Sequence, residues 1–303
     1  MNSNILGTRG ISLRTGVGHK PLSTAVRFLR QTSSQRSWHG ADNCGQLRGI
    51  TLNIGAAAIP RAGAILEWLN HREDDLIVLT ETSCGAGTAI LAAGLCQRGY
   101  QIVATQPSGD RGVLIATRVP VRRRICSSLD VTLPWRTAGI LLDTSPVLAV
   151  IGVYVPSRDR SPAKITRKEN FINSFLSALT GLPRQIRESL VIAGDYNVVS
   201  RRHNPARKGY FTYEYEMHET LENLGLTAAH ELHDNGLHPY SWIGHTGDGY
   251  LYDYVHIAGA LRSRISTCEY LHATREQRLS DHAAVAFSCR LDDADYFASQ
   301  AHT

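Results

Sequence analysis

The sequence predicts an α/β fold arranged as a sandwich, with helices on the outside of packed β-sheets. Short apolar runs that are typical of buried strands alternate with stretches whose apolar residues recur at helical spacing. The sequence has no internal repeat and no glycine-rich linker. It therefore indicates one α/β domain rather than two smaller ones.

The predicted elements begin after residue 46. The predicted strands are 49–54, 76–79 (which stops at Thr80-Glu81), 112–117, 138–142, 148–154, 190–193, 252–257 and 283–287. The predicted helices are one opened by Pro60 and two more near 168–179 and 213–224. The apolar stripes of the two later helices are typical of core packing, so we assign them no chemistry.

The two ends of the chain are expected to lie outside the domain, which we place at 46–292. Residues 1–45 are rich in Ser, Thr, Gly and Arg and show no sustained periodicity. Such a basic leader is compatible with organellar targeting, with a disordered tail or with a start codon placed too far upstream. We expect a cytoplasmic protein, with organellar targeting as the alternative, and we interpret residues 293–303 as a C-terminal tail.

The net charge of +5 arises at the N-terminus. Residues 1–41 hold six basic residues and no acidic one, which leaves residues 42–303 near −1. Overall charge therefore gives no argument for a nucleic-acid partner, and local clusters would have to bind it. The candidate clusters are Arg122-Arg123-Arg124, Arg158 with Arg160, and Arg201-Arg202, each of which could equally be a solvated surface run.

The sequence contains neither a membrane-spanning run nor a disulfide pattern. No stretch of eighteen or more apolar residues is present. The six cysteines are dispersed, without a Cys-x-x-Cys pair, so we expect free thiols.

Four acidic residues, Glu81, Asp195, Asp253 and Asp281, each stand beside an apolar run at widely separated positions. Carboxylates that come from the ends of different strands are far apart in sequence and converge in space. Hard oxygen donors without clustered Cys or His favour Mg²⁺ or Mn²⁺ over zinc. The pattern is therefore typical of metal-assisted cleavage of a phosphate ester, although each acid alone could be a turn or loop residue.

Asp195 and Asn197 follow the predicted strand 190–193. Because side chains alternate along extended backbone, these two should project to the same side and Tyr196 to the other. A carboxylate and an amide that face one point can activate a water molecule and hydrogen-bond a phosphate oxygen. The alternative is an Asx turn, which also favours Asp and Asn after a strand.

His282 follows Asp281 directly, so the two side chains should point in opposite directions and Asp281 should not orient the imidazole. Asp253, at the head of an apolar strand, is the candidate partner. A carboxylate-paired His282 would stay protonated near neutral pH and stabilise charge on a phosphate. The alternatives are that Asp253 is a turn residue and that His282 is a hydrogen-bonded core histidine.

A set of short motifs resembles the endonuclease/exonuclease/phosphatase superfamily from about Leu47 to Leu291. In order they are Asn53, Glu81, Tyr154-Val155-Pro156, Gly194-Asp195-Tyr196-Asn197, Asp253 and Ser280-Asp281-His282. Three further motifs, Phe211-Thr212-x-Glu214, Leu224-Gly225-Leu226 and Tyr240-Ser241-Trp242, look most like the exonuclease III and apurinic/apyrimidinic endonuclease branch. The resemblance implies a four-layer α/β sandwich, in which two packed mixed β-sheets are flanked by helices.

The resemblance also implies roles for individual residues. The metal, Mg²⁺ with Mn²⁺ as a possible substitute, would be held by Glu81 and Asp281 with Asn53 beside it. The catalytic residues would be Asp195 and Asn197 at the attacking water, His282 paired to Asp253 at the phosphate, and Tyr154, which would hydrogen-bond a phosphate oxygen or stabilise the water. Arg136, Arg160 and Trp242 would be further substrate phosphate contacts.

Three positions depart from the pattern of this branch. Gly55 stands where some of its nucleases have a polar or acidic residue, Ser157 where Asn is usual, and Ala284 where Pro is common. These departures affect the choice of substrate more than the chemistry.

The sequence as a whole predicts a monomeric, Mg²⁺-dependent phosphodiesterase that hydrolyses nucleic acid by in-line attack of water. The alternative is a phosphatase or phosphodiesterase acting on a lipid head group or a small phosphoester, which the near-neutral charge of residues 42–303 motivates. A binding protein without catalysis would have lost some of the principal acids, and none is missing.

Overall fold

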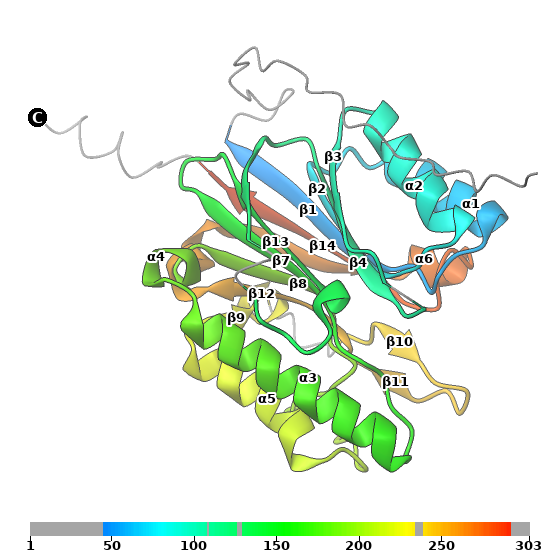
Figure 1. The fold of residues 1–303 in the computed structure, drawn as a ribbon, viewed down its shortest axis with the longest axis vertical. Coiled ribbons are helices and arrows are strands. Elements are labelled where there is room, and N and C mark those ends of the chain that lie inside the picture. The colour runs from blue at the N-terminus through cyan, green and yellow to red at the C-terminus, as the bar shows by residue number, and fades with distance from the viewer. Residues whose placement is uncertain (1–44, 108, 126–128, 234–238, 292–303) are drawn as a thin grey trace, which may run out of the picture. The chain divides into compact units, whose positions relative to one another are not determined.

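The computed structural model of the protein describes residues 45–107, 109–125, 129–233 and 239–291 (Figure 1). All of them belong to one compact unit, Trp38–Thr303. The predictions for the basic leader and the C-terminal tail lie outside the described residues. Four cysteines, Cys84, Cys96, Cys268 and Cys289, are free thiols as predicted, whereas Cys44 and Cys126 lie outside the described residues.

The first sheet has six strands in the order β13-β14-β1-β2-β4-β3. These strands are β1 (Gln46–Asn53), β2 (Leu76–Thr82), β3 (Gln101–Ala104), β4 (Gly112–Thr117), β13 (Ile265–Leu271) and β14 (Ala284–Arg290). β1 and β2 are parallel, while the other neighbours are antiparallel, so the sheet is mixed.

The second sheet also has six strands, in the order β5-β6-β7-β8-β12-β9. They are β5 (Val121–Arg124), β6 (Thr137–Leu142), β7 (Leu148–Tyr154), β8 (Leu190–Asp195), β9 (Leu226–Ala228) and β12 (Asp253–Ala258). β7 and β8 are its parallel pair, since the other pairings are antiparallel. A small hairpin of β10 (Trp242–Ile243) and β11 (Gly249–Tyr250) stands apart from both sheets.

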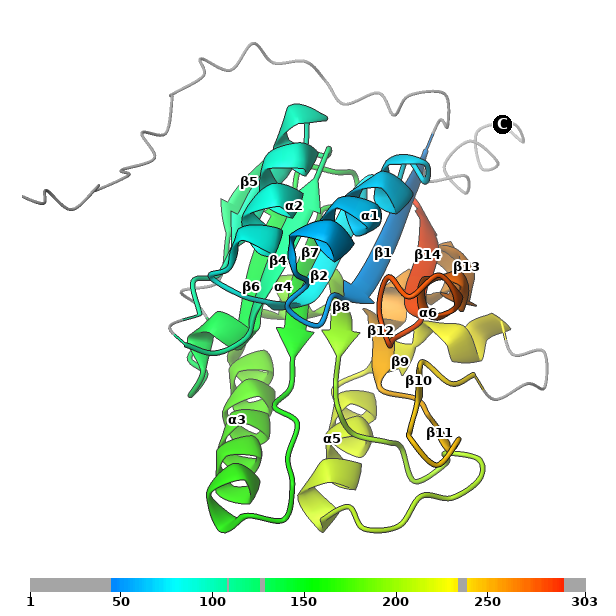
Figure 2. The same ribbon diagram turned by 90° about the vertical axis from the view of Figure 1, so that its right-hand side faces the viewer.

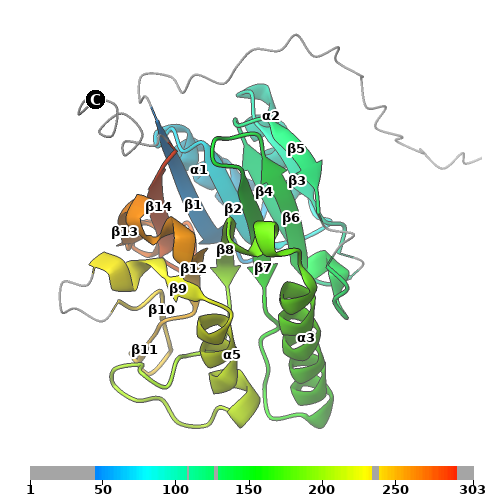
Figure 3. The same cartoon turned by 90° about the vertical axis from the view of Figure 1, so that its left-hand side faces the viewer.

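Helices cover the outer face of each sheet. α1 (Ile59–Asn70) and α2 (Ala86–Gln97) pack on the first sheet, and α3 (Pro162–Gly181) and α5 (Thr212–Asn223) pack on the second (Figures 1 and 3). The short elements are η2 (Pro134–Arg136), α4 (Arg184–Arg187), η3 (Ala229–His233), η4 (Gly259–Arg264) and α6 (Ala273–Glu276). The predicted four-layer α/β sandwich is confirmed.

The alternation of side chains along the strands builds two separate cores. In β2, Ile77 and Leu79 pack under α1 and α2, while Leu76 and Val78 face the second sheet. The two sheets approach closely where β7 carries Gly152, since a Cβ there would lie 2.7 Å from a methyl group of Val113. A larger residue at this position would push the sheets apart.

Several elements were not predicted, for physical reasons. α2 is rich in Ala and Gly on all of its faces, so it shows no apolar stripe. β13 alternates weakly because it is an edge strand with exposed residues on its outer face. The predicted end of β2 at Thr80-Glu81 was too early, because the strand continues to Thr82 through an irregularity in its pairing with β4. Among the described residues, no helix has the length and apolarity needed to cross a membrane.

Candidate active site

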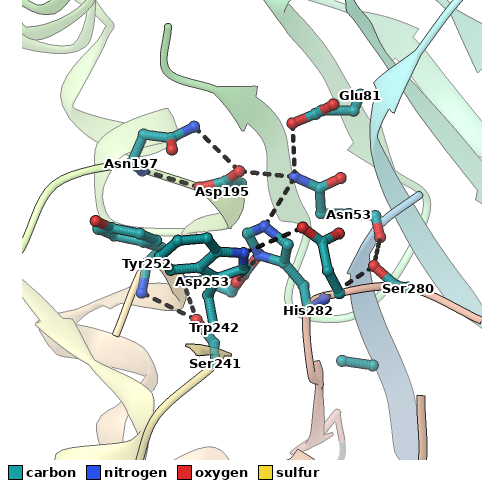
Figure 4. A network of polar contacts seen from close by, with 12 residues as sticks. Asn53, Glu81, Asp195, Asn197, Ser241, Trp242, Tyr252, Asp253, Ser280 and His282 are labelled. Carbon is teal, nitrogen blue, oxygen red and sulfur yellow. Dashed lines mark hydrogen bonds and ion pairs between the residues drawn. The ribbon is translucent and has the colours of Figure 1, made fainter. Parts of the chain in front are cut away.

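Strands from both sheets end at one edge of the sandwich, where the carboxyl ends of β1, β7 and β8 point the same way (Figure 2). In the second sheet, Tyr154 of β7 pairs with Asp195 of β8, and Asp195 pairs in turn with Asp253 of β12. Three polar side chains thus stand side by side across three strands. Asn53 and Glu81 reach the same place from the first sheet (Figure 4).

Glu81 occupies the extra residue of a β-bulge, where the register between β2 and β4 shifts. Its φ of 53° lies in the left-handed region, which is uncommon for a residue other than glycine. The bulge turns the carboxylate toward the site. There, Oε1 accepts hydrogen bonds from the Tyr154 hydroxyl at 2.9 Å and from Asn53 Nδ2 at 3.1 Å. Nε of Arg111 lies 3.8 Å from Oε2.

Asn53 connects the carboxylates. Its Nδ2 donates to Asp195 Oδ2 at 2.8 Å as well as to Glu81, and it lies 3.5 Å from Nε2 of His282. Its Oδ1 accepts from the backbone N–H of Gly55 at 2.8 Å, and the surrounding acceptors fix this amide orientation. Asn53 therefore offers the site a hydrogen-bond donor, whereas its oxygen is engaged elsewhere.

Asp195 is fully buried and lies beside Asn197, as the alternation along the strand predicted. Its two oxygens accept hydrogen bonds from the backbone N–H of Asn197 at 2.9 Å and from its Nδ2 at 3.1 Å. Asn197 has a φ of 49°, so its backbone must be held in place. Burial, together with the negative charges of Asp253 and Glu81, raises the pKa of Asp195 to about 8.

His282 Nδ1 lies 2.7 Å from Asp253 Oδ2, so the structure contains the pairing that the sequence suggested. Asp281 contributes nothing to this contact. Burial alone would lower the pKa of His282, but the adjacent Asp253 carboxylate outweighs it, and the pKa rises to about 10. The imidazole is therefore a cation at neutral pH, with Nδ1 occupied and Nε2 available to the site.

A cleft of about 490 Å³ opens next to these residues. Asp281, Glu81, Asn197 and His282 line one part of it. An aromatic wall formed by Trp242, Tyr250, Tyr252 and Tyr210 also lines the cleft, and it adjoins the acids because Trp242 contacts Asp281. The rings of Trp242, Tyr250 and Tyr252 lie 5.3 to 5.8 Å apart, and the hydroxyl groups of Tyr210 and Tyr252 are 2.5 Å apart.

The three predicted phosphate contacts have different surroundings. Arg160 is exposed, lines the cleft, and has no side-chain partner among the described residues. Trp242 also lines the cleft, but its Nε1 donates to Asp281 Oδ2 at 3.1 Å, so this indole is engaged in orienting an acid.

Arg136 does not fit the prediction of a direct phosphate contact. It is only 3% exposed, it donates to both oxygens of Asp110, and its guanidinium lies 4.4 Å from the centre of the Tyr154 ring. It is held behind Tyr154 rather than in the cleft. The apolar sequence around it gave no sign of the distant partner Asp110.

A sequence profile of the endonuclease/exonuclease/phosphatase family matches residues 50–297 of this chain, a span that includes every residue of the site. The chain belongs to this family. Enzymes of the family hydrolyse phosphoester bonds and depend on metal ions, and this chain is accordingly a phosphoester hydrolase. No curated protein sequence matches the chain.

Solved structures share the fold at low sequence identity. A 3′–5′ exonuclease from Neisseria meningitidis is 20% identical with a TM-score of 0.68, over 80% of this chain and all (100%) of that one. A Neisseria 3′ phosphatase bound to a product DNA hairpin is also 20% identical, with a TM-score of 0.67 over 81% and 99% of the two chains. An AP endonuclease from Archaeoglobus fulgidus is 18% identical, with a TM-score of 0.64 over 80% and 98%.

The residues of the site fit a divalent cation of the kind this family uses. Asp195, Asp253 and His282 each place a ligand-type atom within 4.8 Å of the others. Asp253, however, pairs with Nδ1 of His282 and favours its charged form, and a protonated imidazole has no lone pair for a metal. Oε2 of Glu81 and Oδ1 of Asp281, by contrast, accept no hydrogen bond from the described residues and border the cleft. Carboxylate oxygens of this kind are the ligands that Mg²⁺ prefers.

A largely buried ion network that lines the cleft was not predicted. Lys168 Nζ donates to the backbone oxygen of Asn197 at 2.7 Å and lies 2.8 Å from Glu214 Oε1. Arg158 forms a close ion pair with Oε2 of Glu214, which also accepts from the backbone N–H of Phe211 at 2.8 Å. The available signal was a lysine on the apolar face of α3, three residues before Phe171.

Proposed function

We propose that this protein is a Mg²⁺-dependent phosphodiesterase that cleaves nucleic acid by in-line attack of water. The observation that carries the proposal is one cleft in which carboxylates from both sheets meet a carboxylate-paired imidazolium, with an aromatic wall beside them. The carboxylates suit a hard cation, and the imidazolium suits an anionic reaction centre.

Each side chain has a part in this proposal that follows from its contacts. Glu81 and Asp281 would hold the cation, which when bound would neutralise charge on the phosphate and favour ionisation of the attacking water. The ionised form of Asp195 would accept a proton from that water, and the raised pKa of about 8 makes this form a stronger base than an exposed carboxylate. Asn197, bonded to both oxygens of Asp195, would orient the water.

His282 would donate its Nε2 hydrogen to an oxygen of the scissile phosphate. Asp253 occupies Nδ1 and keeps the imidazole charged, so this donor is fixed before the substrate arrives. Tyr154 donates to Glu81 and so positions a metal ligand. The protein thus surrounds the phosphate with fixed donors on one side and with cation-binding carboxylates on the other.

The preference for nucleic acid rests on the aromatic and basic residues of the cleft. Aromatic rings such as those of Trp242, Tyr250 and Tyr252 stack on nucleobases, at about 1–3 kcal/mol per base. Arg160 and Lys208 line the same cleft, are exposed, and have no side-chain partner among the described residues, so they are free to meet backbone phosphates.

The test is a panel of substrates, with and without excess chelator. It comprises abasic duplex DNA, intact duplex, single-stranded DNA, RNA, a lipid head-group phosphate and small phosphomonoesters. We expect cleavage of at least one nucleic acid, loss of that activity in chelator and its recovery when Mg²⁺ or Mn²⁺ is restored. Activity confined to the lipid or the small phosphoesters would favour the alternative substrate class, and full activity in chelator would exclude the metal mechanism.

A further inference from the structure

A second pocket, of about 540 Å³, lies on the other side of Glu81 and Asp281 from the cleft. These two acids line both spaces, so the pocket and the cleft meet at the proposed cation site. Its remaining walls hold three arginines, Arg61, Arg275 and Arg278.

The three guanidinium groups differ in how far they are already engaged. Arg61 donates to three backbone carbonyls, those of Ile54 at 2.8 Å, Leu279 at 3.1 Å and Gly55 at 2.8 Å, and is therefore a fixed charge. Arg275 Nη2 lies 2.8 Å from Nδ1 of His272, whereas its Nε and Nη1 have no hydrogen-bond partner.

Arg278 is the arginine most available to a ligand. It is exposed, and its side chain has no partner among the residues described here. Its φ is 56°, a left-handed value, at the position that follows the C-cap of α6. Glycine adopts this conformation without strain, whereas other residues do so at a cost of about 1–2 kcal/mol. An arginine at a strained position next to a pocket points to a use for its side chain.

The wall of the pocket next to Arg61 leaves room for such a ligand. Gly55 has a φ of 49°, and a Cβ built there would have as its nearest neighbours Arg61 Nη2 at 3.4 Å and Asp281 Oδ1 at 3.9 Å. The pocket therefore has no side chain at this point and no additional negative charge. With a divalent cation on Glu81 and Asp281, the three arginines would make the pocket strongly positive.

We infer that this pocket binds a second phosphate group, that of the nucleotide next to the cleaved linkage. Guanidinium groups pair with phosphate oxygens in a bidentate geometry and remain charged at all physiological pH values. The inference rests on the proposed function and extends it. Because Arg160 and Lys208 lie in the cleft on the other side of the acids, the substrate strand would continue on both sides of the scissile bond. The enzyme would then cleave internally, without need of a strand end.

The first test measures binding rather than cleavage. Affinity for a labelled DNA strand is measured in chelator over a series of salt concentrations for wild type, Arg278→Gln and Arg278→Gly. Each variant should bind about tenfold more weakly at low salt. The slope of log K against log salt is negative, and its magnitude should decrease by about one. Arg278→Gly also relieves the backbone strain, so its loss of affinity would not reflect a damaged fold.

Arg262→Gln is the matched control. Arg262 is an exposed arginine in η4, it has no partner among the described residues, and it lines neither the cleft nor the pocket. Its affinity and salt slope should equal those of wild type. Equal losses in the Arg262 and Arg278 variants would mean that only the overall charge matters, which would overturn the inference.

The second test identifies the phosphate. A strand carries one uncharged methylphosphonate linkage, placed either 5′ or 3′ of the cleaved linkage, and kcat/KM is measured. On one of the two sides the neutral linkage should reduce the kcat/KM of wild type about tenfold. With that same substrate, Arg278→Gln should have the same kcat/KM as wild type. If the losses caused by the neutral linkage and by Arg278→Gln were additive on both sides, the inference would be overturned. The proposed function would stand as long as wild type still cleaves the charged strand. A wild-type protein that neither binds nor cleaves any strand would overturn both.

Discussion

Asn53 at the end of β1 donates a 2.8 Å hydrogen bond to Asp195 at the end of β8. The two residues belong to different sheets and are 142 positions apart in sequence. One amide group thus ties the two halves of the sandwich together at the site, and it does so at the carboxylate proposed to accept the proton. The relative position of the sheets is thereby coupled to the chemistry.

Replacing Asn53 by Ala should reduce kcat by about 10²–10³-fold, as expected for loss of one preorganised donor. Asn53→Asp should be worse, because it adds a further negative charge beside Asp195 and Glu81. Steady-state kinetics with a saturating divalent cation would measure both. If the Asp variant were as active as wild type, the amide would be acting only as a spacer.

Asp195→Asn keeps the shape of the side chain and removes its charge. We expect turnover to fall by about 10²–10⁴-fold, because the base is lost. The melting temperature in chelator should be equal to or above that of wild type, since burial and the neighbouring acids oppose the charge that the variant lacks. Turnover close to that of wild type would refute the role of Asp195.

Much of this site could be predicted from sequence because the fold obeys local rules. Apolar runs indicated β1, β2, β7, β8 and β12, and a polar residue at or close to one end of each run reaches the site. Partners that depend on tertiary packing left no such signal. Asp110 meets Arg136 across 26 positions, and Lys168 meets Asn197 across 29, through folded geometry alone. The arginine pocket was missed for the same reason, because Arg61 and Arg278 come from opposite ends of the domain.

Asp110→Asn should change how stability depends on pH. Burial alone would raise the pKa of Asp110, but hydrogen bonds from Arg136 and Trp135 outweigh it and hold that pKa below its usual range. A carboxyl with a lowered pKa stabilises the fold above its unfolded pKa of about 3.9, and this contribution disappears as the pH falls further. Denaturant unfolding at pH 7 should show a loss of about 1–3 kcal/mol in the variant, and the difference should shrink toward pH 3.

The same variant should reduce turnover modestly, because Arg136 would no longer be fixed behind Tyr154, which positions Glu81. Asp159→Asn is the control. Asp159 is a surface acid whose side chain is 58% exposed, so its loss should leave turnover unchanged. If the free energy of unfolding of Asp110→Asn depended on pH as that of wild type does, the ion pair would contribute nothing to folding.

Lys168→Met tests whether the buried lysine positions Asn197. Nζ of Lys168 bonds the backbone oxygen of Asn197, which has a left-handed φ, and the side chain is 2% exposed. The variant should lose about 3–5 kcal/mol of stability, because Glu214 keeps a buried charge. It should also lower kcat about tenfold while leaving KM nearly unchanged, since Asn197 would no longer be held beside Asp195. Lys164→Met, on the same helix but with its side chain 57% exposed, should lose at most about 1 kcal/mol.

A double variant separates stability from positioning. Lys168→Met combined with Glu214→Gln removes both charges and leaves an oxygen acceptor for Arg158, so part of the stability should return. Turnover should stay low, because Asn197 still lacks its donor. If kcat recovers together with the melting temperature, Lys168 acts only through the stability of the fold and does not position Asn197.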